Sequence, residues 1–439
     1  MILDLIAIPT THLVALIYCP RHDVSRRKYG EKTINGIPPD MYGVEAVECE
    51  RSCLMSQTWT LLDTTDGQFK ESWAFNGSSV GWADLHIHAK RLRGGKRDGV
   101  DLITVQDGDF SWSVIPTRGM NLWKAQLADW SVGWKSPVQG PVHPHHVPIH
   151  EPSGLGWLDG FDELLARCGL ESNGAPEFDE EGRLAYPLHG KISNIPASKV
   201  TVSVDVENGS VSISGTVLES RFHFSKLQLE TTLTSQRGVP TISIEDTISN
   251  LSASPAEAQM LYHLNLGDPV LDGGAQFNAP LKRLVPRNAH AASSLNGWNN
   301  YPAPQPGIEE QVYFMSMHAD ENQKTLAMLK NAHSTHGCCL RYDATLLPCF
   351  SLWKNPTAFE DGYVTGLEPG TNFPNPRSFE GDHKRFIPLA PGEKAQLGFT
   401  LELLDSEDAI SARDQEIATL QKQGETQVDA EPAADWCAD

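Results

Sequence analysis

A strict alternation of apolar and polar residues between positions 199 and 248 is the feature that most constrains how this chain can fold. A period of two places successive side chains on opposite faces of an extended strand. Short turns that contain glycine separate the alternating runs, so we expect successive strands to pair antiparallel and to bury one face. The alternating runs are residues 199–206, 211–217, 222–233 and 241–248.

Two earlier runs, residues 100–105 and 110–116, repeat this pattern on either side of the hairpin signal Asp107-Gly108-Asp109. This number of strands predicts an all-β protein, a sandwich of large antiparallel sheets with short helices. No glycine-rich phosphate-binding motif joins a predicted strand to a helix, which excludes nucleotide-binding folds.

The 439-residue chain divides into three parts by composition and pattern. Residues 1–54 contain a basic cluster but no sustained period, and we predict a poorly structured N-terminal extension. Residues 55–405 carry the strand pattern and form the predicted sandwich domain. Residues 406–439 begin with a modest amphipathic helix and end in an acidic tail, for which composition predicts disorder over residues 423–439.

The formal net charge of −21 limits the partners that the protein can bind. No stretch offers a basic stripe, which argues against nucleic acid and against anionic membrane surfaces, whereas a neutral, hydroxyl-rich small molecule fits better. Asp4 and Pro9 interrupt the apolar residues 1–19, which therefore predict neither a signal peptide nor a membrane span. Eight cysteines without a framework spacing predict reduced thiols in the cytoplasm, with secretion through a non-standard signal as the alternative.

Glu368 stands between an apolar run, residues 363–367, and a turn-forming run, residues 369–376. We expect such a carboxylate at the end of a strand that faces a cleft. Apolar neighbours would raise its pKa there and suit it to act as a general base. The alternative is a surface glutamate before a turn.

Two histidines are candidate partners of this carboxylate. In the predicted strand 258–268, His263 shares a face with Asn265, which indicates a polar patch on a sheet. A buried, hydrogen-bonded structural histidine is an equal alternative. His189 precedes Gly190, so little side-chain bulk blocks access to it, and its alternative is an ordinary loop histidine.

Further polar residues suggest ligand contacts. Gly119 is expected to aim Arg118 sideways as a donor to a ligand, with a structural salt bridge as an equal alternative. In the proline-rich loop 141–151, the alternate spacing of His143 and His145 could form a metal site that Glu151 completes. The alternative is a loop that covers the sheet and holds no metal.

Four spaced motifs together resemble the aldose 1-epimerase (galactose mutarotase) superfamily, and in particular a branch of it that is a domain of unknown function. The resemblance covers residues 82–404 and implies a β-supersandwich of large antiparallel sheets. The motifs are PTRGM at 116–120, LHGKISNIPA at 188–197, YHLNLGDPVLDGG at 262–274, and LWKNP at 352–356 followed by YVTGLEPGTNFP at 363–374.

The resemblance implies a mutarotase in which Glu368 is the general base, His263 is the general acid and His189 holds the sugar. The base takes the proton of the anomeric hydroxyl while the acid protonates the ring oxygen, so the ring opens and closes on its other face. The resemblance implies neither a metal nor a cofactor. The other predicted substrate-binding residues are Arg118, Arg167, Asn265, Trp353 and Lys354. Trp353 would stack on the sugar, although packing explains it equally well.

Two departures from the family pattern keep other functions open. Leu264 stands where the family has an aromatic residue before Asn-Leu, and residues 371–374 replace the usual Pro-Asp-Ala-like run. The alternatives are a non-catalytic carbohydrate-binding protein, and a lyase or hydrolase that acts on a modified sugar.

Overall fold

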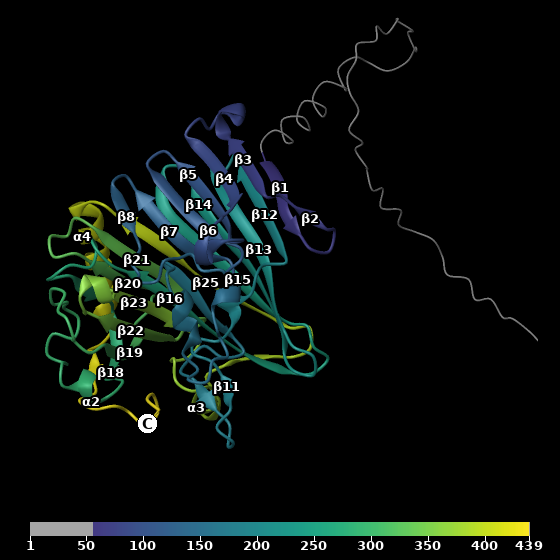
Figure 1. Cartoon of the computed structure of the whole chain (residues 1–439). Helices are drawn as coiled ribbons and strands as arrows, with labels where there is room; N and C mark the ends of the chain where they lie inside the picture. The colour runs from purple at the N-terminus through teal and green to yellow at the C-terminus, as the bar shows by residue number, and fades with distance from the viewer. Residues whose placement is uncertain (1–55, 439) are drawn as a thin grey trace, which may run out of the picture. The chain divides into compact units, whose positions relative to one another are not determined.

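The alternating residues between positions 199 and 248 form four successive antiparallel strands, as their period predicts. The computed structural model describes residues 56–438 and places these strands inside a ten-stranded sheet (Figure 1). Apolar side chains such as Val202 and Ile213 are buried, whereas hydroxyls pair across strands on the other face, as between Ser214 and Thr232 at 2.9 Å. In spatial order the sheet contains β17 (Gln276–Asn278), β20 (Lys324–Lys330), β21 (Gly337–Asp343), β25 (Lys394–Leu404), β15 (Val239–Asn250), β14 (Lys226–Gln236), β13 (Ser210–Ser220), β12 (Lys199–Asp205), β1 (Ser56–Asp63) and β2 (Gln68–Phe69).

A second sheet of fourteen strands shares the hydrophobic core with the first. Its pairings are antiparallel except for the parallel pair β18 and β26. In spatial order it contains β26 (Gln427–Val428), β18 (Leu281–Pro286), β19 (Gln311–Met317), β22 (Cys349–Asn355), β23 (Val364–Gly370), β16 (Ala256–Leu266), β9 (Leu165–Leu170), β7 (Asn121–Leu127), β6 (Phe110–Ile115), β5 (Asp101–Asp107), β4 (Leu85–Arg91) and β3 (Ser72–Asn76), with β24 (Ile387–Leu389) on β16 and β8 (Trp130–Val132) on β7. Strands make up 44% of the structure and helices 12%, which confirms the predicted all-β sandwich.

The period of two gives the central strands of the second sheet two different faces. Tyr262 and Leu264 of β16, and Leu367 of β23, point into the core between the sheets. Leu261 of β16 and Val364 of β23 instead join a separate apolar cluster with residues of the segment between β8 and β9. The outer face of this sheet is therefore covered by irregular chain, and a site can form between the two.

Helices are few and short. The longest, α4, starts after Ser406, whose Oγ accepts a hydrogen bond from the backbone N–H of Ala409 at 3.4 Å. Its residues Ile410 and Ile417 pack against the ten-stranded sheet. The helices are α2 (Ala289–Ala292), α3 (Arg377–Asp382) and α4 (Glu407–Gln421), with 3-10 turns η2 (Gly77–Val80), η3 (Gly95–Arg97), η4 (Pro144–His146), η5 (Gly156–Gly160), η6 (Ile192–Asn194) and η7 (Phe359–Asp361); β10 (Glu177–Phe178) and β11 (Leu184–Tyr186) form a separate hairpin.

The acidic C-terminal segment is ordered up to residue 438, so the predicted disorder is wrong. Arg283 of β18 pairs with Asp429 at 2.6 Å and with Asp435 at 3.0 Å, which offsets part of the negative charge that suggested disorder. The ring of Trp436 lies 4.6 Å from that of Phe373 and adds apolar contact.

The predicted N-terminal extension, residues 1–54, lies outside the described residues. Among residues 56–438, no helix is long and apolar enough to cross a membrane. The cysteines in this part of the chain are buried free thiols, namely Cys168, Cys338, Cys339, Cys349 and Cys437.

Candidate active site

Glu368 and His263 meet on the outer face of the fourteen-stranded sheet. The register pairs Leu264 with Leu367 and Leu261 with Gly370, so the strands β16 and β23 bring His263 opposite Glu368. The Nε2 atom of His263 lies 3.2 Å from Oε1 of Glu368, and both side chains are almost fully buried. The two residues predicted to act as acid and base are therefore in direct contact.

A cavity of about 580 Å³ opens beside this pair. The strands β16, β19, β22 and β23 form its floor, and the irregular segment between β8 and β9 supplies an aromatic wall, in which the turn η5 carries Trp157. The residues that line the cavity include Trp134, Trp157, Phe161, Leu188, His189, His263, Arg287, Glu310, Trp353, Asn355, Asp361, Val364 and Glu368. Polar and charged side chains thus stand beside apolar and aromatic ones, a combination that suits a small-molecule site.

Burial shifts the pKa values of the pair in opposite directions. It raises the pKa of Glu368 to about 8, with a further contribution from the negative charge of Glu310. It lowers the pKa of His263 well below its usual value, with a further contribution from His189. Each side chain is therefore driven toward its neutral form, and at neutral pH the pair holds a single transferable proton.

Gly366 leaves the space that the Glu368 carboxylate occupies. The two residues share one face of β23, and a Cβ on residue 366 would overlap Oε1 of Glu368 and lie 3.1 Å from Cε1 of His263. The carboxylate can lean toward His263 only because residue 366 has no side chain.

His189 and Trp353 also line the cavity, as predicted for residues that contact a ligand. The His189 ring lies 5.2 Å from that of His263, and its Nδ1 donates a hydrogen bond to the Asn173 carbonyl at 3.0 Å. Burial lowers the pKa of His189 to about 4, so the ring is neutral and its Nε2 can accept a hydrogen bond. Trp353 donates from Nε1 to Oε2 of Glu310 at 2.7 Å.

Asn265 does not line the cavity but lies behind His263. Its Oδ1 atom is 2.6 Å from Nδ1 of His263, and the whole residue is buried. The expectation that Asn265 contacts a substrate is therefore corrected, because its amide is occupied by the protein.

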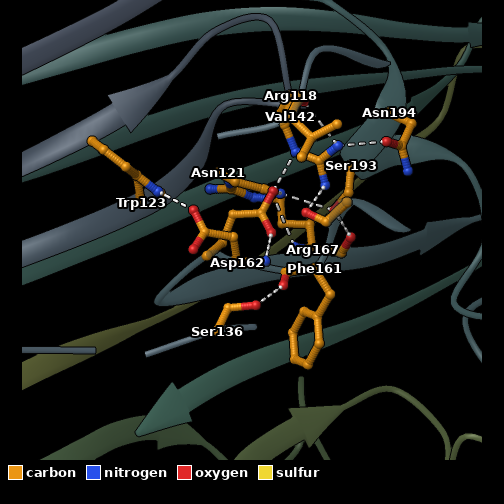
Figure 2. Close-up of polar contacts among 12 residues, drawn as sticks. Arg118, Asn121, Trp123, Ser136, Val142, Phe161, Asp162, Arg167, Ser193 and Asn194 are labelled. Atoms are coloured by element: carbon orange, nitrogen blue, oxygen red, sulfur yellow. Dashed lines mark hydrogen bonds and ion pairs between the residues drawn. The ribbon is translucent and has the colours of Figure 1, made fainter. Parts of the chain in front are cut away.

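Arg118 and Arg167 are buried and fully engaged, which corrects the expectation that they bind a substrate (Figure 2). Arg118 forms an ion pair with Glu163 and donates to Oδ1 of Asn194 at 2.7 Å. Arg167 forms an ion pair with Asp246 at 2.6 Å inside the sandwich. Successive side chains of a strand point to opposite faces, and Ala166 and Cys168 of β9 face the cavity side. Arg167 between them therefore points into the sandwich.

Lys354 is likewise buried away from the cavity, next in sequence to Trp353 but on the opposite face of β22. Its Nζ donates to the backbone carbonyls of Trp298 at 2.6 Å and Asn300 at 2.8 Å. Burial lowers the pKa of Lys354 to about 8. The predicted contact of Lys354 with a sugar is therefore corrected as well.

The loop of histidines that could have formed a metal site has other contacts. His143 accepts a hydrogen bond at Nδ1 from the backbone N–H of His145, and Glu151 accepts from the backbone N–H of Leu155 at 2.7 Å. Within residues 56–438, no group of three or more metal-ligating side chains comes together.

Several cavity residues were not expected from the sequence. Arg287 lines the cavity, and its positive charge acts on the pKa values of His189 and Glu368. Arg287 forms no ion pair with any described residue, and Glu310, which also lines the cavity, is exposed. Trp157 and Phe161 come from an irregular segment whose pattern carries no period. The aromatic and glycine content of residues 157–161 was the one available signal.

A larger hollow, of about 1120 Å³, lies on the outer face of the ten-stranded sheet. Its charged side chains largely pair with one another, as Lys324 does with Asp343 at 3.2 Å and Arg341 with Glu416 at 2.5 Å. The smaller cavity, with its contacting acid and base, is therefore the better candidate for chemistry.

Comparison with known proteins supplies the family. The family model described as a domain of unknown function, DUF4432, matches residues 97–403. The chain belongs to the DUF4432 family. The matched part begins in η3 and ends in β25, so this DUF4432 domain contains every residue that lines the cavity. No functionally curated protein matches the chain.

Solved structures with similarity to this chain include two that are described in terms of sugar epimerases. A candidate aldose 1-epimerase from Klebsiella pneumoniae is 36% identical with a TM-score of 0.83, covering 86% of this chain and 99% of its own. A galactose mutarotase-like protein from Clostridium acetobutylicum is 14% identical with a TM-score of 0.49, covering 74% of this chain and 99% of its own. The family match and the Klebsiella pneumoniae structure confirm the predicted resemblance to a branch of unknown function in the aldose 1-epimerase superfamily, and the fold.

Proposed function

We propose that this protein is a carbohydrate-active epimerase, a mutarotase that interconverts the anomers of an aldose or a related sugar. The observation that carries the proposal is the 3.2 Å contact between Glu368 and His263 beside a cavity. The opposite pKa shifts of the two groups support it, because functional acid–base pairs concentrate such shifts.

The chemistry requires an acid and a base close together. To open a pyranose ring, one group takes the proton of the anomeric hydroxyl while another gives a proton to the ring oxygen, and both oxygens are bonded to the same carbon. Before the ring opens, the single proton of the pair moves from Glu368 to Nε2 of His263. Glu368 then accepts the first proton and His263, protonated on Nε2, donates the second. The aldehyde then rotates and the same steps in reverse close the ring on its other face. Each positioned group contributes about 10² to 10⁴ in rate.

The rest of the cavity suits a sugar. Trp353 and Trp157 offer aromatic surface for the apolar face of a pyranose. His189, Arg287 and Glu310 offer acceptors and donors to its hydroxyls. The cavity volume of about 580 Å³ falls in the range of small-molecule sites, about 300–1,000 Å³.

Exchange NMR on equilibrated aldoses tests the proposal. The protein should accelerate exchange between the two anomeric proton signals of at least one sugar, and Glu368→Gln should abolish the acceleration. Glu309→Gln is the matched control, because Glu309 is an exposed neighbour that does not line the cavity. Binding of sugars without any acceleration would instead favour a carbohydrate-binding protein, and a new unsaturated or cleaved product would favour a lyase or hydrolase.

A further inference from the structure

We infer that Asn265 is a positioning residue that fixes the tautomer of His263, and that the buried Arg118–Glu163 ion pair holds Asn265 in place. The tautomer follows from contacts alone, whereas its effect on turnover rests on the proposed function. Asn265 would act through His263 and not on the sugar.

The contacts of the Asn265 amide fix its orientation. Its Nδ2 donates to the backbone carbonyl of Glu163 at 3.0 Å and to that of His263 at 3.0 Å. Because carbonyl oxygens only accept, the atom that faces His263 at 2.6 Å is the amide oxygen Oδ1. An amide oxygen also only accepts, so Nδ1 of His263 must carry hydrogen. In the neutral ring, Nε2 is then the unprotonated nitrogen, and it faces Glu368.

Glu163 is fixed at both its carbonyl and its carboxylate. The carbonyl accepts from Asn265 and also from Nε1 of Trp134 at 3.1 Å. The carboxylate pairs with Arg118 and accepts from the backbone N–H of Asp162 at 3.1 Å. Arg118 in turn donates to the Gly160 carbonyl at 3.1 Å and to Asn194 (Figure 2).

This arrangement matters for proton transfer. When an imidazolium gives away its Nε2 proton, the neutral ring that remains has its hydrogen on Nδ1. Asn265 stabilises that product and leaves Nε2 as the only nitrogen of the His263 ring that exchanges a proton in the cavity. The opposite tautomer would set two lone pairs against each other at 2.6 Å and would leave Nε2 no lone pair with which to take the proton back.

Nitrogen-15 NMR on histidine-labelled protein tests the tautomer without any assay of activity. The His263 signals are assigned by their loss in His263→Gln. We expect Nδ1 protonated and Nε2 unprotonated in the wild-type protein, and a population of the opposite tautomer in Asn265→Leu. Asn265→Asp keeps an acceptor and should keep the wild-type tautomer. A wild-type ring protonated on Nε2, or an Asn265→Leu ring unchanged from wild type, would overturn the proposal.

Activity gives a second readout. Asn265→Leu should lower kcat about 10- to 100-fold with little change in KM, and Asn265→Asp should recover part of the loss. The control is Asn250→Leu, which removes another fully buried amide, one that bonds the carbonyls of Leu389 and Ser254 far from the cavity. An equal loss of kcat in the control would reduce Asn265 to a purely structural residue. If NMR shows the expected tautomer but the protein epimerises no sugar, the role of Asn265 in fixing the tautomer is supported and the proposed function is wrong.

Discussion

The carboxylate of Glu368 lies over the Cα atom of Gly366, two residues earlier on the same strand. The geometry of the acid–base pair therefore depends on the absence of a side chain at residue 366 as well as on the two side chains that meet.

Gly366→Ala should displace the carboxylate without unfolding the protein, because the overlapping atom is the end of a flexible side chain. A misplacement of about 1 Å can cost about 10²-fold in rate, so we expect kcat to fall by 10- to 100-fold. Steady-state kinetics measure this. Gly381→Ala is the control, since its new Cβ would meet only an ordinary contact at 3.9 Å. Full activity in Gly366→Ala would show that the pair tolerates displacement.

The rate of epimerisation should depend on pH through the single proton of the pair. Above about pH 8, Glu368 loses its proton, and neither group has one for the ring oxygen, so kcat/KM should fall. At acid pH, well below 6.5, His263 gains a second proton, and no group can accept one, so the rate falls again. A rate that rises through pH 8 would contradict this. Glu310→Gln should move the alkaline limb to lower pH, because it removes a negative charge that raises the pKa of Glu368.

The raised pKa of Glu368 also predicts how stability varies with pH. Between its unfolded value of 4.5 and about 8, the folded protein holds a proton that the unfolded chain has lost, so rising pH destabilises the wild-type fold. Glu368→Gln removes this dependence. Its free energy of unfolding relative to wild type should increase from pH 5 to pH 8, by a few kcal/mol, and then level off. Urea unfolding at several pH values measures the difference, and a constant difference would refute the raised pKa.

Arg287 should contribute to ligand affinity, since it lines the cavity and forms no ion pair with any residue in the range 56–438. A hydrogen bond from a charged group is worth about 1.5–3 kcal/mol, so Arg287→Met should raise KM about 10- to 100-fold. The comparison is Arg237→Met, at an exposed arginine that lies over Trp82 outside the cavity. Titration with neutral and anionic sugars would show which kind of substituent the guanidinium contacts. An unchanged KM for all of them would exclude the contact.

Arg167 should affect stability and not binding. Arg167→Met leaves Asp246 buried without its partner, which costs about 3–5 kcal/mol. The same change at Arg183, in an exposed pair with Asp179, should cost less than about 1 kcal/mol. Denaturant unfolding measures both. A rise in KM for folded Arg167→Met would instead restore the role in substrate binding that we predicted from the sequence.

Local pattern was enough to predict the sandwich but not the site. The strands within residues 199–248 could be predicted because the alternation of apolar and polar residues is visible over a few neighbouring positions. The contact of Glu368 with His263 depends on the register of two strands about a hundred residues apart. The strand pattern offered His263 only as one of two candidate partners, and the family resemblance was needed to assign the two residues as acid and base. The alternation of side chains along a strand also contained information that our prediction of the site did not use. Trp353 and Lys354 are adjacent in a strand, so they could not both face the same cavity.

Residues 436 and 437 pack against neighbours of residues that line the cavity. The Sγ atom of Cys437 lies 3.6 Å from the carbonyl of Pro286, the residue before Arg287, and Trp436 rests on Phe373, the residue before the cavity-lining Pro374. Removing or displacing residues 436 and 437 would therefore shift the cavity wall and change ligand affinity, even though the acid and the base lie on other strands.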